Sequence, residues 1–326
     1  MGCFTPLTFE VQIRSDNVPD SNSKNTEFSI TKSLKLISNL GNGSHSNVQL
    51  YRSRTFPDVL YAAKCFSVDS ISEEQREKIR EDSSTIIDLD LNDVVSYLSS
   101  VEEKGRIYVV SEYVKGCSLN DFLRVNEGNF GEREAALIVG KVMRVIQKMH
   151  INNIIHGDIR PENIIFPDKN DCRNFKLIDF SFISTQKTID KRLSTVHQFY
   201  LAPEKLILRE TIKSDVWSVG VLTHFLLTKK YPFSFKDYDN LLTRKELPSF
   251  NPRLLHSKVI SETAVDFISK CLVPNQENRL SSLQALKHPW IDEKHGKSKK
   301  NNLSSVHPLS SMLSSVDLDK SYTLDY

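Results

Sequence analysis

The chain has 326 residues, of which 39% are apolar and 26% are charged, and its formal net charge is +2. A chain of this length and composition is globular, can bury a sizeable core, and is expected to form one two-lobed unit or two domains. The small net charge gives no signal for a nucleic-acid partner, so partners have to be inferred from local sites.

The cysteines and the apolar stretches indicate the compartment. The five cysteines lie far apart and form no CxxC pair, so neither a zinc site nor a disulfide framework is predicted. No stretch approaches eighteen apolar residues and the N-terminus lacks a signal-peptide core, so we expect a cytoplasmic protein without a membrane span. Acylation at Gly2 or Cys3 is disfavoured because the motif requires Ser or Thr at position 6, where this chain has Pro6.

Both ends of the chain have a polar composition. Residues 14–27 are rich in Ser, Asn and Asp, so residues 1–30 are predicted to be a disordered leader. Residues 293–326 are polar, contain Ser-Ser pairs and lack a calcium-binding loop, which predicts a tail. The folded part is therefore expected over residues 31–292.

A strand-like pattern begins at Leu34, and residues 40–48 (Leu-Gly-Asn-Gly-Ser-His-Ser-Asn-Val) predict a hairpin tip. Its glycines would let backbone N–H groups approach a phosphate closely, but the same residues also suit an ordinary Asn-Gly turn. Residues 59–66 predict the next strand, in which Lys64 stands among apolar residues. An exposed lysine on an edge strand is the alternative interpretation of Lys64.

Two helices and one more strand are predicted further along the chain. Residues 71–87 are charged and then apolar, which favours one amphipathic helix. Residues 106–114 predict a buried strand that runs into a connector. Residues 133–153 carry apolar residues at a period of about 3.6, typical of a helix that faces the core.

Residues 154–163 (Ile-Ile-His-Gly-Asp-Ile-Arg-Pro-Glu-Asn) predict an irregular loop after this helix, because Pro161 disfavours helical backbone before it. Such a loop can aim Asp158 and Asn163 at one point, and Asp179 follows an apolar run sixteen residues later. Converging carboxylate and amide oxygens suit Mg²⁺ that carries phosphate, with one Asp free to accept a proton from a hydroxyl group. A polar turn that caps a helix is the alternative for each segment alone.

These segments resemble, in the same order, the glycine-rich loop, the strand lysine, the catalytic loop and the DFG segment of the eukaryotic protein kinase family. Residues 200–204 (Tyr-Leu-Ala-Pro-Glu), 214–221 (Ser-Asp-Val-Trp-Ser-Val-Gly-Val) and 275–291 resemble three later motifs. The closing residues are most similar to the calcium/calmodulin-dependent kinase group. The resemblance implies an α+β bilobal fold, with a small β-rich N-lobe over residues 31–111 and a larger, mainly helical C-lobe over residues 112–292.

The resemblance also implies a site for ATP and Mg²⁺. Asp158 would orient the attacking hydroxyl group, Lys64 and Arg160 would contact phosphates, and Asn163 and Asp179 would bind the metal. The nucleotide-binding residues that it implies are Gly41, Gly43, Val48, Ala62, Lys64, Ser111, Glu112, Val114 and Ile165.

Several implied roles concern the surroundings of this site. The helix over residues 71–87 should supply an acidic partner for Lys64, for which we choose Glu81, with Asp82 or Glu77 as alternatives. Ser111 would guard the pocket behind the adenine, and its small side chain is expected to leave that pocket open to bulky inhibitors. His156 would support Phe180, Glu204 would form a buried ion pair with Arg279, and Asp215 would brace the catalytic loop.

The sequence departs from the family pattern at several positions. Gly157 replaces the loop Arg that binds activation-segment phosphate, and Arg160 replaces a Lys. Ser46 and Ser181 replace glycines, and Val196-His197 replaces a Gly-Thr pair. Phosphorylation of the activation segment is therefore not expected to be the usual switch.

The leading hypothesis is an ATP- and Mg²⁺-dependent protein serine/threonine kinase, with turnover that these departures are expected to slow. Glu162 would attract a basic residue near the phosphorylated site of a protein substrate. A pseudokinase that binds nucleotide and partners without transferring phosphate is the alternative, and a small-molecule phosphotransferase is a third interpretation. The sequence does not indicate an oligomeric state.

Overall fold

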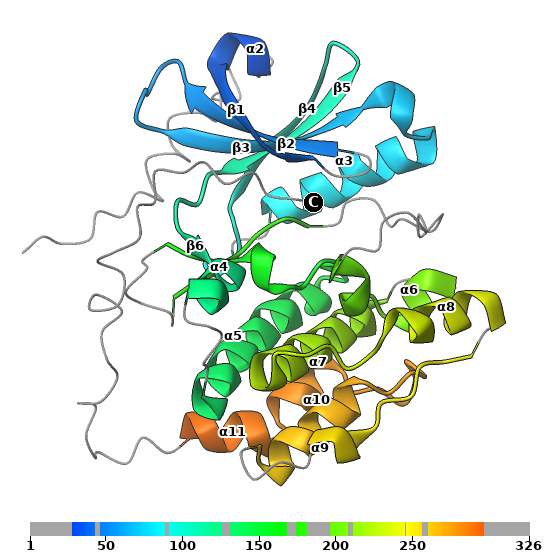
Figure 1. Cartoon of the computed structure of the whole chain (residues 1–326). Helices are drawn as coiled ribbons and strands as arrows, with labels where there is room; N and C mark the ends of the chain where they lie inside the picture. Colours follow the sequence, from blue (N-terminus) through cyan, green and yellow to red (C-terminus); the bar gives the residue numbers. More distant parts are fainter. Residues whose placement is uncertain are drawn as a thin grey trace, which may run out of the picture.

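The computed structural model describes residues 28–42, 46–88, 91–125, 131–167, 174–180, 196–207, 211–244, 246–255 and 260–296. The predicted leader and tail lie mostly outside these residues. The same is true of Gly43 and Ser181. The chain forms two lobes, a smaller one dominated by a sheet and a larger helical one (Figure 1).

The N-lobe is a five-stranded antiparallel sheet in the order β1-β2-β3-β5-β4. The strands are β1 (Leu34–Asn42), β2 (Ser46–Ser53), β3 (Leu60–Ser67), β4 (Tyr97–Glu103) and β5 (Arg106–Glu112). Side chains alternate between the two faces of a strand, so β3 buries Tyr61, Ala63 and Cys65 in a small cluster below the short helix α2 (Ile30–Ser33). The opposite face packs against α3 (Glu73–Asp88), which confirms the helix predicted over residues 71–87.

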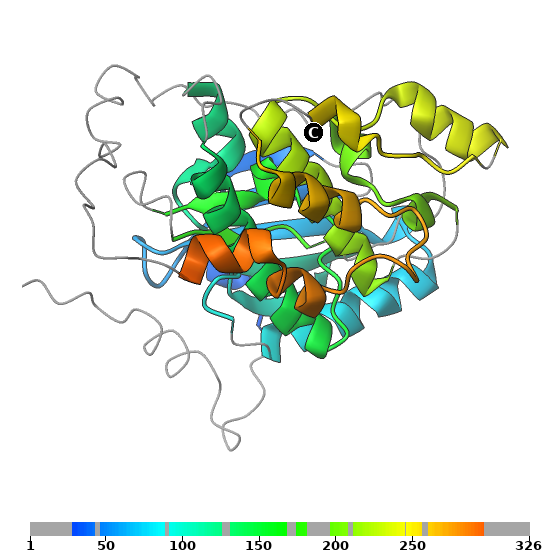
Figure 2. The same ribbon diagram turned by 90° about the horizontal axis from the view of Figure 1, so that it is seen from below.

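The C-lobe is built around two long helices that pack side by side, α5 (Glu132–Ile151) and α7 (Ile212–Thr228). The first confirms the helix predicted over residues 133–153. Seen from below, α9, α10 and α11 lie on the outer side of this pair (Figure 2). The other helical elements are η1 (Val68–Ser70), α4 (Leu119–Val125), η2 (Pro161–Asn163), η3 (Val196–Tyr200), α6 (Pro203–Ile207), α8 (Phe235–Arg244), η4 (Pro252–Leu255), α9 (Glu262–Cys271), α10 (Ser282–Leu286) and α11 (Pro289–Gly296).

Close packing of α7 against α9 depends on a glycine. A Cβ atom added to Gly220 would stand 2.7 Å from the Cβ atom of Cys271, a separation that real side chains do not adopt. The N-terminus of α7 is capped by Thr211 and Ser214 in a reciprocal capping box, so its first orphan N–H groups are satisfied. α7 therefore begins at a defined point, which matters because Asp215 lies in its first turn.

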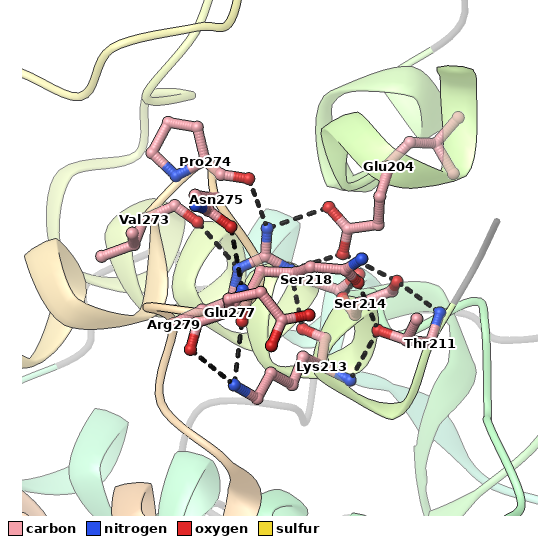
Figure 3. A network of polar contacts seen from close by, with 12 residues as sticks. Glu204, Thr211, Lys213, Ser214, Ser218, Val273, Pro274, Asn275, Glu277 and Arg279 are labelled. Carbon is pink, nitrogen blue, oxygen red and sulfur yellow. Dashed lines mark hydrogen bonds and ion pairs between the residues drawn. The ribbon is translucent and has the colours of Figure 1, made fainter. Parts of the chain in front are cut away.

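A buried ion pair links the segment before α7 to the loop before α10 (Figure 3). The guanidinium group of Arg279 donates to both carboxylate oxygens of Glu204, at 2.5 and 2.9 Å, and both side chains are almost fully buried. Arg279 also donates to the backbone carbonyl groups of Val273 and Lys213. The ion pair expected between Glu204 and Arg279 is thus present, and it connects α6 to the loop before α10.

Two backbone links join the lobes beside the site. A three-stranded sheet of β6 (Cys117–Ser118), β7 (Ile164–Phe166) and β8 (Lys176–Leu177) lies at the top of the C-lobe. Leu177 donates its N–H to the carbonyl of Asp93 and accepts from the N–H of Val95, both at 2.9 Å. The covalent link runs from β5 to β6 through residues 113–116.

Candidate active site

One buried carboxylate, that of Asp215, is hydrogen-bonded to the backbone of the predicted catalytic loop. Asp215, in the first turn of α7, accepts hydrogen bonds from the backbone N–H groups of His156 and Gly157 and from Nε2 of His150, each at 2.9 Å. Burial alone would raise its pKa, but the hydrogen bonds and charges of His150 and the neighbouring amides hold the pKa of Asp215 below its usual value. The expectation that Asp215 braces the loop therefore has a direct geometric basis.

Asp158 and Asn163 are in contact within this loop. The side-chain amide of Asn163 donates to the backbone carbonyl and to Oδ2 of Asp158, both at 2.8 Å. Arg160 also donates from Nε to Oδ2 of Asp158, at 3.1 Å. One carboxylate oxygen of Asp158 thus receives two side-chain donors, which orients the group and stabilises its charged form.

Arg160 is buried, with 3% exposure, and lies between the side chains of Asp158 and Glu162. A carboxylate oxygen of Glu162 lies 3.7 Å from its Nη1 atom. Burial lowers the pKa of a guanidinium group, but the charges of Asp158 and Glu162 outweigh burial and raise the pKa of Arg160. A guanidinium group bonded in this way keeps a positive charge beside Asp158 at any physiological pH.

Lys64 and Asp179 meet between the lobes. Nζ of Lys64, on β3, lies 2.5 Å from Oδ1 of Asp179 and also donates to the carbonyl of Phe180 at 3.1 Å. Asp179 has a backbone φ of +60°, a left-handed conformation that is uncommon for a residue other than glycine and often occurs at functional sites. The N–H of the preceding residue, Ile178, donates to the carbonyl of Asn163 at 2.9 Å, so the two predicted metal-binding segments are adjacent.

The ring of Phe180 packs on His156, with ring centroids 4.7 Å apart. His156 is fully buried, and burial lowers its pKa below the usual value, so the imidazole is neutral. Its Nδ1 atom accepts from the N–H of Asp158 at 3.2 Å. His156 therefore supports both the Asp158 backbone and Phe180, as expected.

The predicted nucleotide residues come from neighbouring strands and from the connector between the lobes. Gly41 pairs with Val48 across β1 and β2, and Val48 pairs with Lys64 across β2 and β3. Ala62 pairs with Ser111, the last but one residue of β5. These pairings place one face of the β1–β3 hairpins and the end of β5 beside Lys64.

On the other side of the connector, Glu112 forms an ion pair with Lys176 at 2.5 Å, and Lys176 pairs with Ile165 across β7 and β8. Val114 lies in the connector and is half-buried. Val48, Ala62, Val114 and Ile165 are all half-buried, the exposure expected of residues that line a ligand site.

Glu81 is a predicted site residue that the structure does not bring to Lys64. Its side chain is exposed, whereas the buried face of α3 carries Ile79, Ser83 and Ile86. Glu81 is two residues from both Ile79 and Ser83, about 200° around the helix, so it points away from the sheet. In this conformation the Lys64 ammonium instead contacts Asp179 and the carbonyl of Phe180, and the choice of Glu81 is corrected.

Tyr97 is a site residue that no local sequence pattern predicts, and it lies directly beside Ser111. The two residues are cross-strand partners on β4 and β5, so their side chains share one face of the sheet. The Tyr97 ring meets Phe180 edge-on with centroids 5.3 Å apart, and its hydroxyl accepts a long hydrogen bond, 3.4 Å, from the Phe180 N–H. The Tyr97 ring therefore lies beside Ser111 and against Phe180, and the open pocket expected behind Ser111 stays a prediction.

The donor set of the site fits Mg²⁺ and phosphate. Asp158, Asn163 and Asp179 supply oxygen atoms, which Mg²⁺ prefers, and Lys64 supplies a cation for phosphate. Within the described ranges no group of three His, Cys, Asp or Glu side chains could hold a metal by itself. A metal bound here would thus need nucleotide or water oxygens in addition to Asn163 and Asp179, as is usual for Mg²⁺.

Comparisons with known proteins found similar sequences and a matching family model. The family model described as "Protein kinase domain" matches residues 34–291. Calcium-dependent protein kinase 3 of Plasmodium berghei (strain Anka) is 32% identical over 221 residues, which is 67% of this chain and 40% of that protein. Calcium/calmodulin-dependent protein kinase type 1 of Caenorhabditis briggsae is 30% identical over 253 residues, which is 77% of this chain and 70% of that protein.

A solved structure is similar as well. The crystal structure of Rad53 in complex with AMP-PNP matches with a TM-score of 0.66 and 28% identity, and the match covers 81% of this chain and 67% of that one. The chain spans about 40% of the length of the calcium-dependent relative.

Among the described helices, none is long and apolar enough to cross a membrane.

Proposed function

The chain belongs to the protein kinase domain family, and from this premise we propose that it is a serine/threonine kinase that transfers the γ-phosphate of ATP to a hydroxyl group of a protein. The observation that carries the proposal is the meeting of four polar side chains from distant parts of the sequence. Lys64 bonds Asp179, Asp158 bonds Asn163, and the backbone of Asn163 bonds the segment that contains Asp179.

Asp158 would accept the hydrogen bond of the substrate hydroxyl and take its proton. The hydroxyl oxygen forms the new bond to the γ-phosphorus atom, the bond from that atom to the bridging oxygen breaks, and ADP leaves. Arg160 keeps the Asp158 carboxylate oriented, and Lys64 would hold the phosphates of ATP. Mg²⁺, when bound by Asn163 and Asp179, would neutralise charge on the phosphates.

The substrate is proposed to carry a basic residue close to the phosphorylated hydroxyl. Glu162 is the acidic group that supports this, since it follows Arg160 in the catalytic loop and its side chain keeps 23% exposure. Its charge is shared with Arg160, so the preference for a basic residue should be modest. A cytoplasmic location is part of the proposal, and it is supported by the free state of Cys65, Cys117 and Cys271.

A pseudokinase that binds partners is the second candidate, and two observations favour it. Lys64 is bonded to Asp179 rather than to α3, and Glu81 is exposed. Against it, each of the four polar side chains needed for transfer is present and placed beside another. The buried ion pair of Glu204 and Arg279 favours a protein kinase over a small-molecule phosphotransferase, because such phosphotransferases typically lack these two motifs.

The test measures phosphate transfer from labelled ATP by the full chain to itself and to a basic peptide. Asp158→Asn should lower the rate by roughly a hundredfold or more, since a positioned general base contributes about 10²–10⁴. Asp237→Asn is the matched control, because the Asp237 carboxylate bonds only Ser234 at the start of α8 among the described hydrogen bonds and should leave the rate unchanged.

Equal transfer by wild type and Asp158→Asn would remove Asp158 from the mechanism. No transfer by the wild type, together with a rise in melting temperature on addition of Mg·ATP, would replace the kinase proposal with the nucleotide-binding pseudokinase. Substituting the basic residues of the peptide by alanine tests Glu162, and an unchanged KM for that peptide would remove its role.

A further inference from the structure

The backbone of Gly157, the residue before Asp158, is hydrogen-bonded to charged groups at both its N–H and its carbonyl. Gly157 donates its N–H to Oδ1 of Asp215 at 2.9 Å, and its carbonyl oxygen accepts from Nζ of Lys205 at 2.7 Å. Gly157 has a φ of +77°, a conformation that costs glycine little and other residues more. The backbone that leads into Asp158 is thus fixed by a carboxylate below and an ammonium group beside it.

Lys205 is unusual because it is a buried lysine, with only 6% of its surface exposed. A buried ammonium group is costly unless it makes strong hydrogen bonds, and a charge-assisted bond of 2.7 Å to a carbonyl is of that kind. Its helix, α6, is anchored one residue earlier by the ion pair of Glu204 with Arg279. The backbone that carries Lys205 is therefore tied to the loop before α10 through Arg279.

The catalytic loop has no side chain at position 157 that could carry a charge, and Lys205 brings a cation to the backbone of that same residue. We propose that Lys205 is a positioning residue for Asp158: it holds the Gly157 carbonyl and so aligns the carboxylate that follows. This inference rests on the proposed function for its effect on turnover, but the contact itself can be tested without turnover.

The experiment compares four forms of the full chain: wild type, Lys205→Met, Lys205→Arg and Lys213→Met. Methionine keeps the length of the side chain and removes the charge, so it suits a buried site. Lys213 is the matched control, because it also donates from Nζ to backbone carbonyls, but to those of Gln276 and Glu277 in the loop before α10 (Figure 3).

Lys205→Met should lower kcat roughly tenfold to a hundredfold while KM for ATP changes by less than about twofold, because alignment of Asp158 is lost and nucleotide contacts are not. Lys205→Arg should recover most of the rate. Lys213→Met should keep the wild-type kcat. A folded Lys205→Met protein with unchanged kcat would overturn the proposal, and so would an equal loss in Lys213→Met.

Hydrogen exchange of the backbone amides of residues 156–158 gives a second readout that needs no activity. Lys205→Met should speed exchange at these amides relative to wild type, whereas Lys213→Met should not. If the wild type transfers no phosphate, the proposed function fails, and this exchange result alone decides whether Lys205 holds the loop. Unchanged exchange in Lys205→Met would overturn the inference.

Discussion

Replacing Arg279 by methionine should destabilise the protein far more than any change to its exposed ion pairs. The guanidinium group makes two hydrogen bonds to Glu204, at 2.5 and 2.9 Å, and further bonds to the carbonyl groups of Val273 and Lys213. The variant would leave the carboxylate of Glu204 buried with Ser214 as its remaining hydroxyl donor. A buried carboxylate without an opposite charge beside it lowers the free energy of unfolding.

The size of the effect follows from burial. Removing one member of a buried ion pair costs about 3–5 kcal/mol, mainly because the other charge stays buried and unpaired. In a domain of this size each kcal/mol corresponds to about 2–4 °C in Tm, so the variant should melt about 6–20 °C below wild type. Lys270→Met is the control, since its pair with Asp266 is half exposed on both sides and should be worth less than about 1 kcal/mol.

Urea unfolding followed by circular dichroism would give the free energies of unfolding, and a thermal scan would give Tm. The double variant with Glu204→Gln should be less destabilised than the sum of the two single variants, because the buried charge is then removed. An Arg279→Met protein whose unfolding free energy lies within about 1 kcal/mol of wild type would refute the reasoning that this pair closes the C-lobe.

Three further predictions concern ligand access, pH and packing. Tyr97→Ala should open the space behind Ser111 and tighten binding of an ATP-competitive inhibitor with a bulky aromatic group by roughly tenfold or more, measured by calorimetry; equal affinity for wild type would show that the Tyr97 ring does not block that space. Burial lowers the pKa of His156 and of His224. At a pH just below the usual histidine pKa, the unfolded state therefore binds more protons than the folded state. The free energy of unfolding should thus fall as the pH drops from about 7.5 to about 5.5. His224→Gln should flatten that slope in urea titrations, and an unchanged slope would point to other groups. Gly220→Ala should lower Tm by several degrees in a thermal scan, because the added methyl group overlaps a side chain of α9.

The helices and the polar core of the site could be predicted because their signals are local. The apolar period of α5 needs only neighbouring residues, and the loop with Asp158 and Asn163 is one short segment. Asp179 follows the end of a strand, which is also readable in sequence. The order of such segments then implied the bilobal fold.

What could not be predicted depends on register and on contacts between distant segments. α3 carries acidic residues on several sides, so its sequence does not reveal that Ser83 rather than Glu81 faces inward. Tyr97 meets Ser111 only because of the pairing of β4 with β5, which a β-bulge shifts next to Tyr97. The contact of Lys205 with Gly157 spans 48 residues, and no spacing rule connects them.

The two backbone links between the lobes also limit how the lobes can move. One link is the chain at residues 113–116, and the other is the pair of backbone hydrogen bonds that Leu177 makes with Asp93 and Val95. Two attachment points define an axis, so rotation about that line strains neither of them, whereas sliding across it would break the bonds of Leu177. Opening and closing should therefore be a rotation of one lobe over the other, with the loops farthest from the axis travelling the greatest distance.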